Sequence, residues 1–212
     1  MKGILFKPEM IKAIIEDRKT QTRRVIKLPK TSGQPIVKCE DCGDWAWQNN
    51  QGFWHHLSNL KPRYQIGEVV YVKEGCTVYE ALYGDWCVIY DDDTERTIYP
   101  PEVFILKHLI DSTQEYTART MPAWAARYFI KIKDAKAERL QEITWQEMIA
   151  EGAPYIPNHI IGFRELWNSI NKPPYDWQSN PWVWVYEFNK VKHGEEKYEN
   201  GTKENCKNPK WG

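Results

Sequence analysis

Two cysteines and two histidines are the residues whose types and spacing first suggest chemistry. Cys39 and Cys42 are separated by two residues, and His55 and His56 follow shortly after them. Two thiolates with one or two imidazoles would form a tetrahedral structural zinc site. The sequence has neither a second Cys-x-x-Cys pair nor a His-x3–5-His pair, which such sites normally use. We therefore expect no cofactor and a turn carrying free thiols, with a structural zinc as the alternative.

Basic residues are concentrated near the N-terminus, although the whole chain is neutral. The chain has 29 Lys and Arg residues and 29 Asp and Glu residues, whereas residues 1–38 hold ten basic residues against three acidic ones. The overall balance excludes a histone-like polycation and an acidic tail protein. The basic segment is typical of a surface that contacts phosphate, and it is equally compatible with a solvated helix and strand.

Hydropathy and cysteine content indicate the broad class of the protein. The mean hydropathy is −0.69, and no run of 18 apolar residues is present, so we expect no membrane span. The apolar stretch near the N-terminus is too short for a secretory signal. Five cysteines without an export signal favour reduced thiols, so we expect a cytoplasmic protein.

Short helices and several strands are the elements that must position any functional residues. Helical spacing of apolar residues covers 8–18, 145–151 and 160–171. Strand patterns cover 19–26, 67–74, 128–134 and 181–188, and 78–90 is expected to form a hairpin. The 11 Trp and 12 Tyr residues suit a sheet-rich core and flat surfaces for stacking bases. Because strands and helices do not alternate regularly, the pattern predicts an α+β fold with a mixed or barrel-like sheet.

Two features predict the ends of the second helix. Thr144 and Glu147 have the spacing of a capping box, in which each side chain bonds the other residue's backbone N–H group. Gly152 stands where a helix commonly stops in a left-handed conformation. Glu151 therefore lies at the end of a short, well-defined helix.

Four motifs, in this order, resemble those of the ASCH domain. Residues 18–24 (RKTQTRR) follow a helix, like the K-T-x-T-x-R strand of that family, and 67–70 (GEVV) is similar to its next strand. Residues 140–152 resemble its capped helix, and 185–188 (VYEF) resemble its closing strand.

A narrower resemblance and its gaps suggest the domain organisation. Residues 121–127 and 177–185 are similar to a phage and prophage subgroup of ASCH-domain proteins. The resemblance does not cover 27–61 or 77–117, which we interpret as insertions. We therefore expect one domain over 1–191 and a polar C-terminal tail over 192–212.

The resemblance implies a PUA-like fold, a small mixed β-barrel with short helices capping its openings. In relatives, a cleft of this fold accepts RNA or a modified base. Some small ASCH proteins are amidohydrolases that remove the acetyl group from N4-acetylcytidine, and others have been described as ribonucleases.

The resemblance also implies a catalytic group of Lys19, Thr22 and Glu151, the positions that match the amidohydrolase motif. A threonine needs a neighbouring base to take its proton, and a buried lysine near other cations has a lowered pKa. Glu151 would orient Lys19 or pass a proton to the leaving amine.

The spacing of Lys19 and Thr22 sets a geometric condition on this group. Residues three apart in a regular strand point to opposite faces, so the two converge only if Lys19 lies in the turn before the strand or a bulge intervenes. The alternative is an ordinary strand with Thr20, Thr22 and Arg24 on one polar face and Lys19 solvated.

Further residues are expected to contact the ligand or nucleic acid: Arg18, Thr20, Arg23, Arg24, Glu74, Trp124 and Arg127. A guanidinium presents a planar fork of donors to a phosphate or a base carbonyl, and an aromatic ring offers a face for a base. The alternatives are surface salt bridges for Arg24 and Arg127 and a core position for Trp124.

Three functions remain open from the sequence. The favoured one is a phage-encoded module that binds RNA or a modified nucleoside in a cleft between Lys19, Thr22 and Arg24 on one side and Glu151 on the other. The second is a metal-independent hydrolase that acts on N4-acetylcytidine-type substrates or on RNA. The third is a protein-interaction module that contacts a host factor through the insertions.

Overall fold

The structure is a computed structural model, and its described part is an α+β fold that contains mostly strands and few helices. The described residues are 1–27, 32–39, 45–49, 51–56, 61–80, 86–98, 113–153 and 159–191. The α+β class is as predicted. The expected tail over 192–212 lies outside the described residues.

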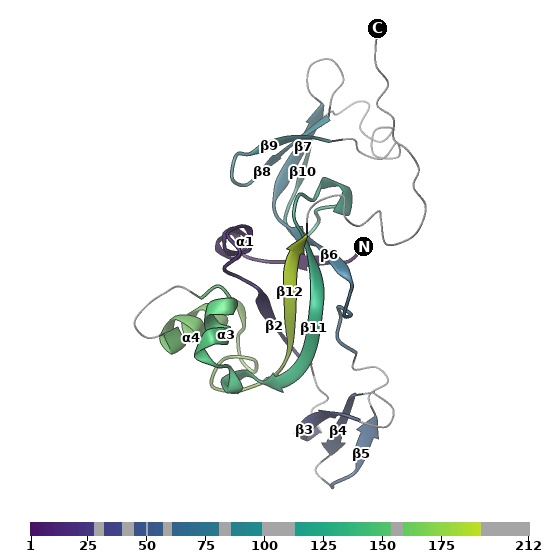
Figure 1. Cartoon of the computed structure of the whole chain (residues 1–212), viewed down its shortest axis with the longest axis vertical. Coiled ribbons are helices and arrows are strands. Elements are labelled where there is room, and N and C mark those ends of the chain that lie inside the picture. The colour runs from purple at the N-terminus through teal and green to yellow at the C-terminus, as the bar shows by residue number, and fades with distance from the viewer. Residues whose placement is uncertain are drawn as a thin grey trace.

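A five-stranded sheet forms the centre of the molecule (Figure 1), with the strand order β1-β6-β11-β12-β2. Its strands are β1 (Gly3–Leu5), β2 (Gln21–Val25), β6 (Val69–Lys73), β11 (Phe129–Arg139) and β12 (Trp182–Val191). The β1–β6 pair is parallel and the other pairs are antiparallel. The long β11–β12 pair has one irregularity in register, between Ile132 and Asp134.

The central sheet is open, which corrects the expectation of a barrel. Among the described strands, β1 and β2 are the two edges, and no ladder joins them. Closure requires every strand to pair on both sides. The edge strand β1 is only three residues long and is paired along its whole length with β6.

Two smaller sheets extend from opposite ends of the central sheet (Figure 1). One contains β3 (Ser32–Lys38), β4 (Trp45–Asn49) and β5 (Trp54–His56). The other has the order β10-β7-β8-β9 and contains β7 (Cys76–Glu80), β8 (Trp86–Tyr90), β9 (Glu95–Ile98) and β10 (Thr113–Tyr116). Apart from Cys76, the first residue of β7, each sheet lies within one of the two ranges that we interpreted as insertions.

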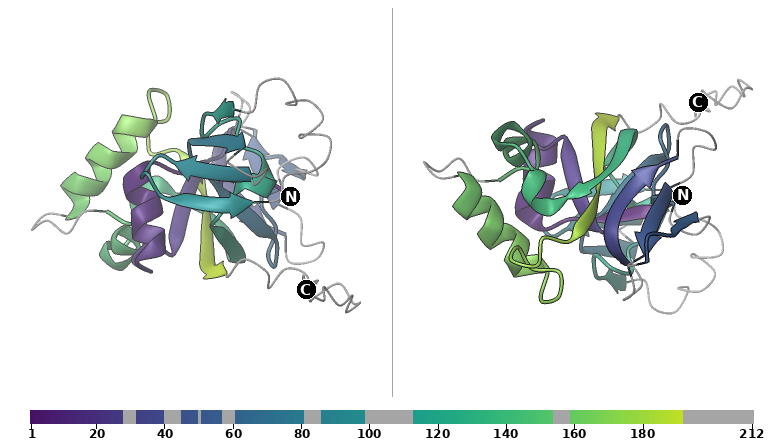
Figure 2. Two further views of the ribbon diagram at one scale, coloured as in Figure 1. Left: turned by 90° about the horizontal axis from the view of Figure 1, so that it is seen from above. Right: turned by 90° about the horizontal axis from the view of Figure 1, so that it is seen from below.

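The described helices gather beside the β2 edge of the central sheet (Figure 2). They are α1 (Pro8–Ile15), α3 (Trp145–Ala150) and α4 (His159–Ile170). Short 3-10 turns form at η2 (Ala123–Ala125), which packs against the sheet that contains β7 and β8, and at η3 (Leu140–Glu142). None of the described helices is long and apolar enough to cross a membrane.

Strand β12 is buried on both faces, which explains its nearly continuous apolar sequence. Trp184, Tyr186 and Phe188 pack into a core cluster with β1, β6, β11 and α1. Val183 and Val185 point to the opposite face, where they pack against α3 and α4. Period-two alternation thus places each set of residues in a different core.

The turn after α1 holds Lys19 at the meeting point of three elements. The helix predicted to reach Arg18 ends at Ile15, and Asp17 takes a φ of 56°. The Lys19 N–H group donates to the Ala13 carbonyl oxygen, 3.0 Å away, and the Thr20 N–H group donates to Ala150, 2.8 Å away. Lys19 therefore precedes β2, which begins at Gln21, rather than lying within it.

Helix α3 begins and ends as its sequence predicts. The Thr144 hydroxyl accepts from the Glu147 N–H group, and the Glu147 carboxylate accepts from the Thr144 N–H group, which completes the capping box. Gly152 takes a φ of 78° directly after the helix. A β-carbon at Gly152 would lie 3.3 Å from the β-carbons of both Ala13 and Lys19.

Replacing Gly152 tests how tightly the end of α3 packs on Lys19. Gly67 is a matched control because its φ is 84° and a β-carbon there would meet nothing within 4 Å. A left-handed conformation costs an alanine about 1–2 kcal/mol, so we expect Gly67→Ala to lower the free energy of unfolding by that amount. Gly152→Ala should lower it by at least ~1 kcal/mol more. Urea unfolding followed by tryptophan fluorescence measures both, and equal losses would contradict the close packing.

Candidate functional site

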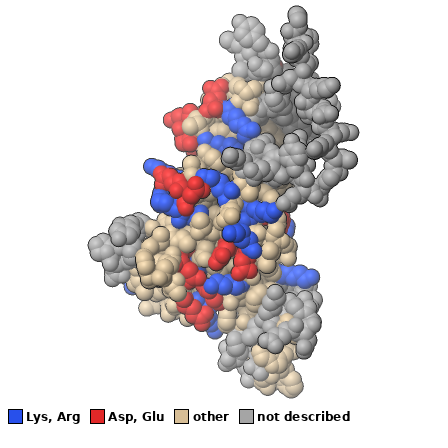
Figure 3. Space-filling model, in the orientation of Figure 1, with Lys and Arg blue, Asp and Glu red and all other residues tan. Residues whose placement is uncertain are grey.

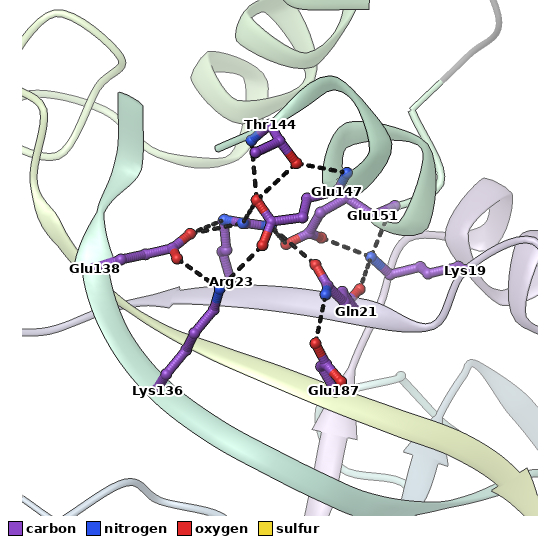
Figure 4. Close-up of polar contacts among 9 residues, drawn as sticks. All are labelled: Lys19, Gln21, Arg23, Lys136, Glu138, Thr144, Glu147, Glu151 and Glu187. Atoms are coloured by element: carbon purple, nitrogen blue, oxygen red, sulfur yellow. Dashed lines mark hydrogen bonds and ion pairs between the residues drawn. The ribbon is translucent and has the colours of Figure 1, made fainter. Parts of the chain in front are cut away.

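Lys19 is a buried cation whose hydrogen-bonding capacity is fully used. The residue is 2% exposed. Its ammonium donates to Glu151 Oε2 at 2.8 Å, to the Glu151 carbonyl oxygen at 2.6 Å and to the Gln21 carbonyl oxygen at 2.8 Å (Figure 4). A protonated lysine has three donors, so Lys19 joins the end of α3 to the start of β2 with all of them.

Arg23 is the second buried cation, and it collects carboxylates from two elements. Its side chain is 0% exposed. Its terminal nitrogens lie 2.6 Å from Glu138 of β11, 3.2 Å from Glu147 of α3 and 3.3 Å from Glu151. Lys136 lies 3.0 Å from both Glu138 and Glu147 and closes the network (Figure 4). We call Lys19, Arg23, Lys136, Glu138, Glu147 and Glu151 the ion network.

The environment of Lys19 lowers its pKa, as the chemistry inferred from the sequence requires. Burial is the largest cause, and the nearby Arg24 and Arg23 guanidinium groups act in the same direction. Attraction to Glu151 and the hydrogen bond with it oppose the shift. Arg18, which was expected to contact the ligand, is exposed and pairs with Glu16 instead.

Lys19 and Thr22 meet the geometric condition only in part. Lys19 lies in the turn before β2. Because the residue is buried there, the alternative of a solvated lysine is wrong. However, all three Lys19 donors contact Glu151 or Gln21, and the Thr22 hydroxyl forms no hydrogen bond with the residues that the structure describes. A general base must lie within hydrogen-bond reach of the proton it takes. In this arrangement Lys19 does not act on Thr22 directly.

Thr22 and Glu151 line a pocket between β2, α4 and the segment that joins β1 to α1. We call it the β2 pocket, and its volume is about 290 Å³. Phe6, Met10 and Trp167 supply apolar walls, while Thr22 and Glu151 supply polar groups. Its size is at the lower end of the ~300–1,000 Å³ found for small-molecule sites.

Arg24 lies at the edge of the β2 pocket with donors to spare. One terminal nitrogen donates to the Leu5 carbonyl oxygen at 2.7 Å, and the guanidinium carbon lies 5.3 Å from the centre of the Phe6 ring. The Nε atom is buried and has no hydrogen-bond partner. Within the described residues Arg24 forms no ion pair with a carboxylate. Burial lowers its pKa, but a guanidinium stays charged at neutral pH.

Glu74 and Arg127 form a separate cluster, away from the β2 pocket. Arg127 donates to both Glu74 carboxylate oxygens, at 2.9 and 2.7 Å, and lies 2.9 Å from Asp92. Its guanidinium carbon is 4.0 Å from the centre of the Tyr90 ring. Burial raises the pKa of Glu74, and Arg127 opposes this shift. With its donors on two carboxylates, Arg127 fits the salt-bridge alternative better than a phosphate contact.

The other expected ligand-binding residues lie elsewhere. Thr20 is exposed and does not line the β2 pocket. Trp124 packs with Tyr116, with ring centres 6.3 Å apart, at the edge of a core cluster. This position fits the core alternative for Trp124.

The structure describes only part of the zinc candidate. Cys42 lies outside the described residues, and only the backbone of His55 and His56 is described, in β5. Among the residues that are described, no group of three or more His, Cys, Asp or Glu side chains is arranged to hold a metal ion.

The sequence interpretation missed the carboxylates and the ring that surround the predicted site. Glu138 was not singled out and Glu147 was interpreted only as a capping residue, yet both contact Arg23. The centre of the Phe6 ring lies 5.5 Å from Lys19 Nζ and 5.3 Å from the guanidinium carbon of Arg24. Charged residues that alternate with Ala135 and Ala137 along β11 were the one available signal, because a strand places Lys136 and Glu138 on one face.

Comparison of the chain with known protein families, with curated proteins and with solved structures finds no match. The function of this chain is therefore inferred from the geometry of the site.

Removing Arg23 should strongly destabilise the fold. Arg23→Met leaves Glu138, Glu147 and Glu151 without the cation they share, and removal of one partner of a buried pair costs about 3–5 kcal/mol. Arg18→Met is the control, because its exposed pair with Glu16 is expected to contribute less than ~1 kcal/mol. Chemical unfolding of both variants measures the difference. Similar losses for the two would show that the buried network does not stabilise the fold.

Proposed function

We propose that this chain binds a nucleoside, either free or as part of RNA, in the β2 pocket. The observation that carries the proposal is a small pocket with apolar and aromatic walls in which Thr22, Arg24 and Glu151 converge. The ASCH resemblance belongs to this proposal, with the open five-stranded sheet in place of the PUA-like barrel. In that family the corresponding cleft accepts RNA or a modified base.

The polar groups of the pocket suit the edge of a base. Thr22 offers a hydroxyl that can donate and accept, and Arg24 offers donors to a base carbonyl. The two carboxylate oxygens of Glu151 pair with Lys19 and Arg23. Each of them has a second lone pair that can accept a hydrogen bond from an exocyclic amine. The rings of Phe6 and Trp167 supply the apolar surface against which bases pack.

The ion network favours binding because it holds the polar wall of the pocket in one place. Glu151 is fixed from one side by Lys19 and from the other by Arg23. A site whose groups are already ordered loses less entropy when a ligand binds. The same hydrogen bonds use the Lys19 donors, which argues against Lys19 as a base in this state.

Hydrolysis of an N4-acylated cytidine is a second candidate, favoured by the lowered pKa of Lys19 beside a pocket that contains Thr22. In that reaction Thr22 Oγ1 would form a bond to the acyl carbon as neutral Lys19 takes the hydroxyl proton. The C–N bond would then break, with a proton passing to the leaving amine, and water would release the acid from Thr22. Lys19 must first move from Glu151 toward Thr22.

Thr22→Val separates binding from turnover, because it removes the hydroxyl and keeps the shape. Isothermal titration calorimetry with N4-acetylcytidine and cytidine should show binding to the wild type. Loss of one hydrogen bond of about 0.5–1.5 kcal/mol predicts a two- to tenfold weaker affinity for Thr22→Val. Thr20→Val is the matched control and should bind like the wild type, since Thr20 is exposed and outside the pocket.

Chromatography of the same mixtures distinguishes the two candidates. Binding without release of cytidine supports a binding module. Release by the wild type and the Thr20→Val variant, but not by Thr22→Val, supports hydrolysis. Failure of the wild type to bind either nucleoside would contradict the proposal, as would equal affinities of Thr22→Val and the wild type.

A further inference from the structure

A second cavity, of about 530 Å³, is lined by six cations and by no acidic residue among the residues that the structure describes. The cations come from four separate stretches of the chain and are Arg24, Lys27, Lys61, Arg63, Lys73 and Arg119. We call this cavity the cationic groove. A neutral chain that assembles six positive charges around one groove produces a strong local field for anions.

The cations of the groove lack carboxylate partners among the described residues. Within the part of the chain that the structure describes, none of the six forms an ion pair. Lys73 donates instead to the Arg119 carbonyl oxygen at 2.6 Å, and the Arg63 guanidinium carbon lies 5.6 Å from the centre of the Tyr64 ring. This differs from the described surface in Figure 3, where Lys and Arg mostly lie beside Asp and Glu.

The floor of the groove adds no negative charge. Tyr64 and Tyr186 pack edge to face with ring centres 5.3 Å apart, and the Tyr64 hydroxyl donates to the Gly3 carbonyl oxygen at 3.1 Å. Burial raises the pKa of Tyr186 to about 12 and also raises that of Tyr64. Both phenols are therefore neutral at physiological pH, and the groove keeps its positive charge.

Arg24 connects the groove to the β2 pocket. It lines both cavities, together with its neighbour Val25 and with Leu5. Its Nε atom is buried without a partner, and a buried donor that lacks an acceptor is costly. An anionic oxygen at this boundary would balance the charge of Arg24.

We infer that the cationic groove holds the phosphodiester backbone of a single RNA strand whose base occupies the β2 pocket. The ligand is thus an oligonucleotide rather than a free nucleoside, an inference that rests on the proposed function. Six cations exceed what one phosphate group can engage, and they extend over a cavity larger than the pocket itself. Several consecutive phosphates match that number and spread.

The test compares three ligands: N4-acetylcytidine, its 5′-monophosphate, and an RNA hexanucleotide of cytidine that carries one N4-acetylcytidine. The groove variant is Lys61→Ala with Arg63→Ala, since both side chains are exposed and neither lines the β2 pocket. The control is Lys133→Ala with Arg164→Ala, which removes the same two residue types from exposed positions outside both cavities.

The hexanucleotide should bind the wild type at least about tenfold more tightly than the nucleoside does, with the monophosphate in between. The groove variant should lose about tenfold or more in affinity for the hexanucleotide and keep its affinity for the nucleoside. For the groove variant, the slope of log K against log salt concentration should become shallower by about 1.4. This corresponds to about 0.7 for each contact to a single strand that is lost. The control should change no affinity by more than about twofold.

Several outcomes would overturn the inference. One is a groove variant that binds the hexanucleotide like the control, and another is a hexanucleotide that binds no more tightly than the nucleoside. If the monophosphate bound as tightly as the hexanucleotide, the groove would be a site for a single phosphate and not for an RNA strand. If none of the three ligands bound the wild type, both the groove and the pocket would be contradicted as binding sites.

Failure of the pocket alone would have a different signature. Thr22→Val would then leave the affinity for every ligand unchanged, while the groove variant would still bind the hexanucleotide more weakly than the wild type does. That result would support the groove as a nucleic-acid site and contradict the proposed function of the pocket.

Discussion

Two cations, Lys19 and Arg23, are buried beside β2, and the arrangement of the site follows from the need to compensate them. Charges removed from water are tolerated only when they are paired and hydrogen-bonded. Glu147 lies in α3, Glu151 directly follows that helix and Glu138 lies in β11, so the compensation joins a helix and a central strand to β2. The capping box at Thr144 and the left-handed Gly152 hold α3 at the length that brings both Glu147 and Glu151 to these cations.

The same constraint separates the cations that stabilise the fold from the one that is available to a ligand. Lys19 and Arg23 face carboxylates and are closed to an anionic ligand, whereas Arg24, the next residue along β2, has no carboxylate partner among the described residues. Alternation along the strand thus separates a structural cation from one that is available for binding. The pocket on one side of Arg24 is small and mostly apolar, and the groove on the other side is cationic. A ligand with a flat apolar part and a chain of phosphates matches this order.

Much of the local structure could be predicted because its causes lie close together in the sequence. The capped helix α3, the helix α4 and the strands β2, β6 and β12 depend on periodicity and on caps within a few residues. The ion network could not be predicted as a whole, since Arg23 and Glu138 are 115 residues apart and only the paired strands bring them together. The open edge of the sheet could not be predicted either, because β1 is three residues long and too short to give a strand pattern. The Glu74–Arg127 pair, which replaced two expected ligand contacts, likewise depends on packing between distant segments.

The central claim is that a buried, charge-compensated Lys19 holds Glu151 in the wall of a nucleoside site, and the titration of Lys19 itself tests it most directly. The Nζ resonance can be followed by NMR in protein labelled with ¹⁵N-lysine and assigned by its loss in Lys19→Met. We predict that Lys19 titrates below its ordinary pKa of 10.5 and that its resonance shifts when N4-acetylcytidine is added. A pKa at or above 10.5, with a resonance that does not respond to the nucleoside, would contradict the account.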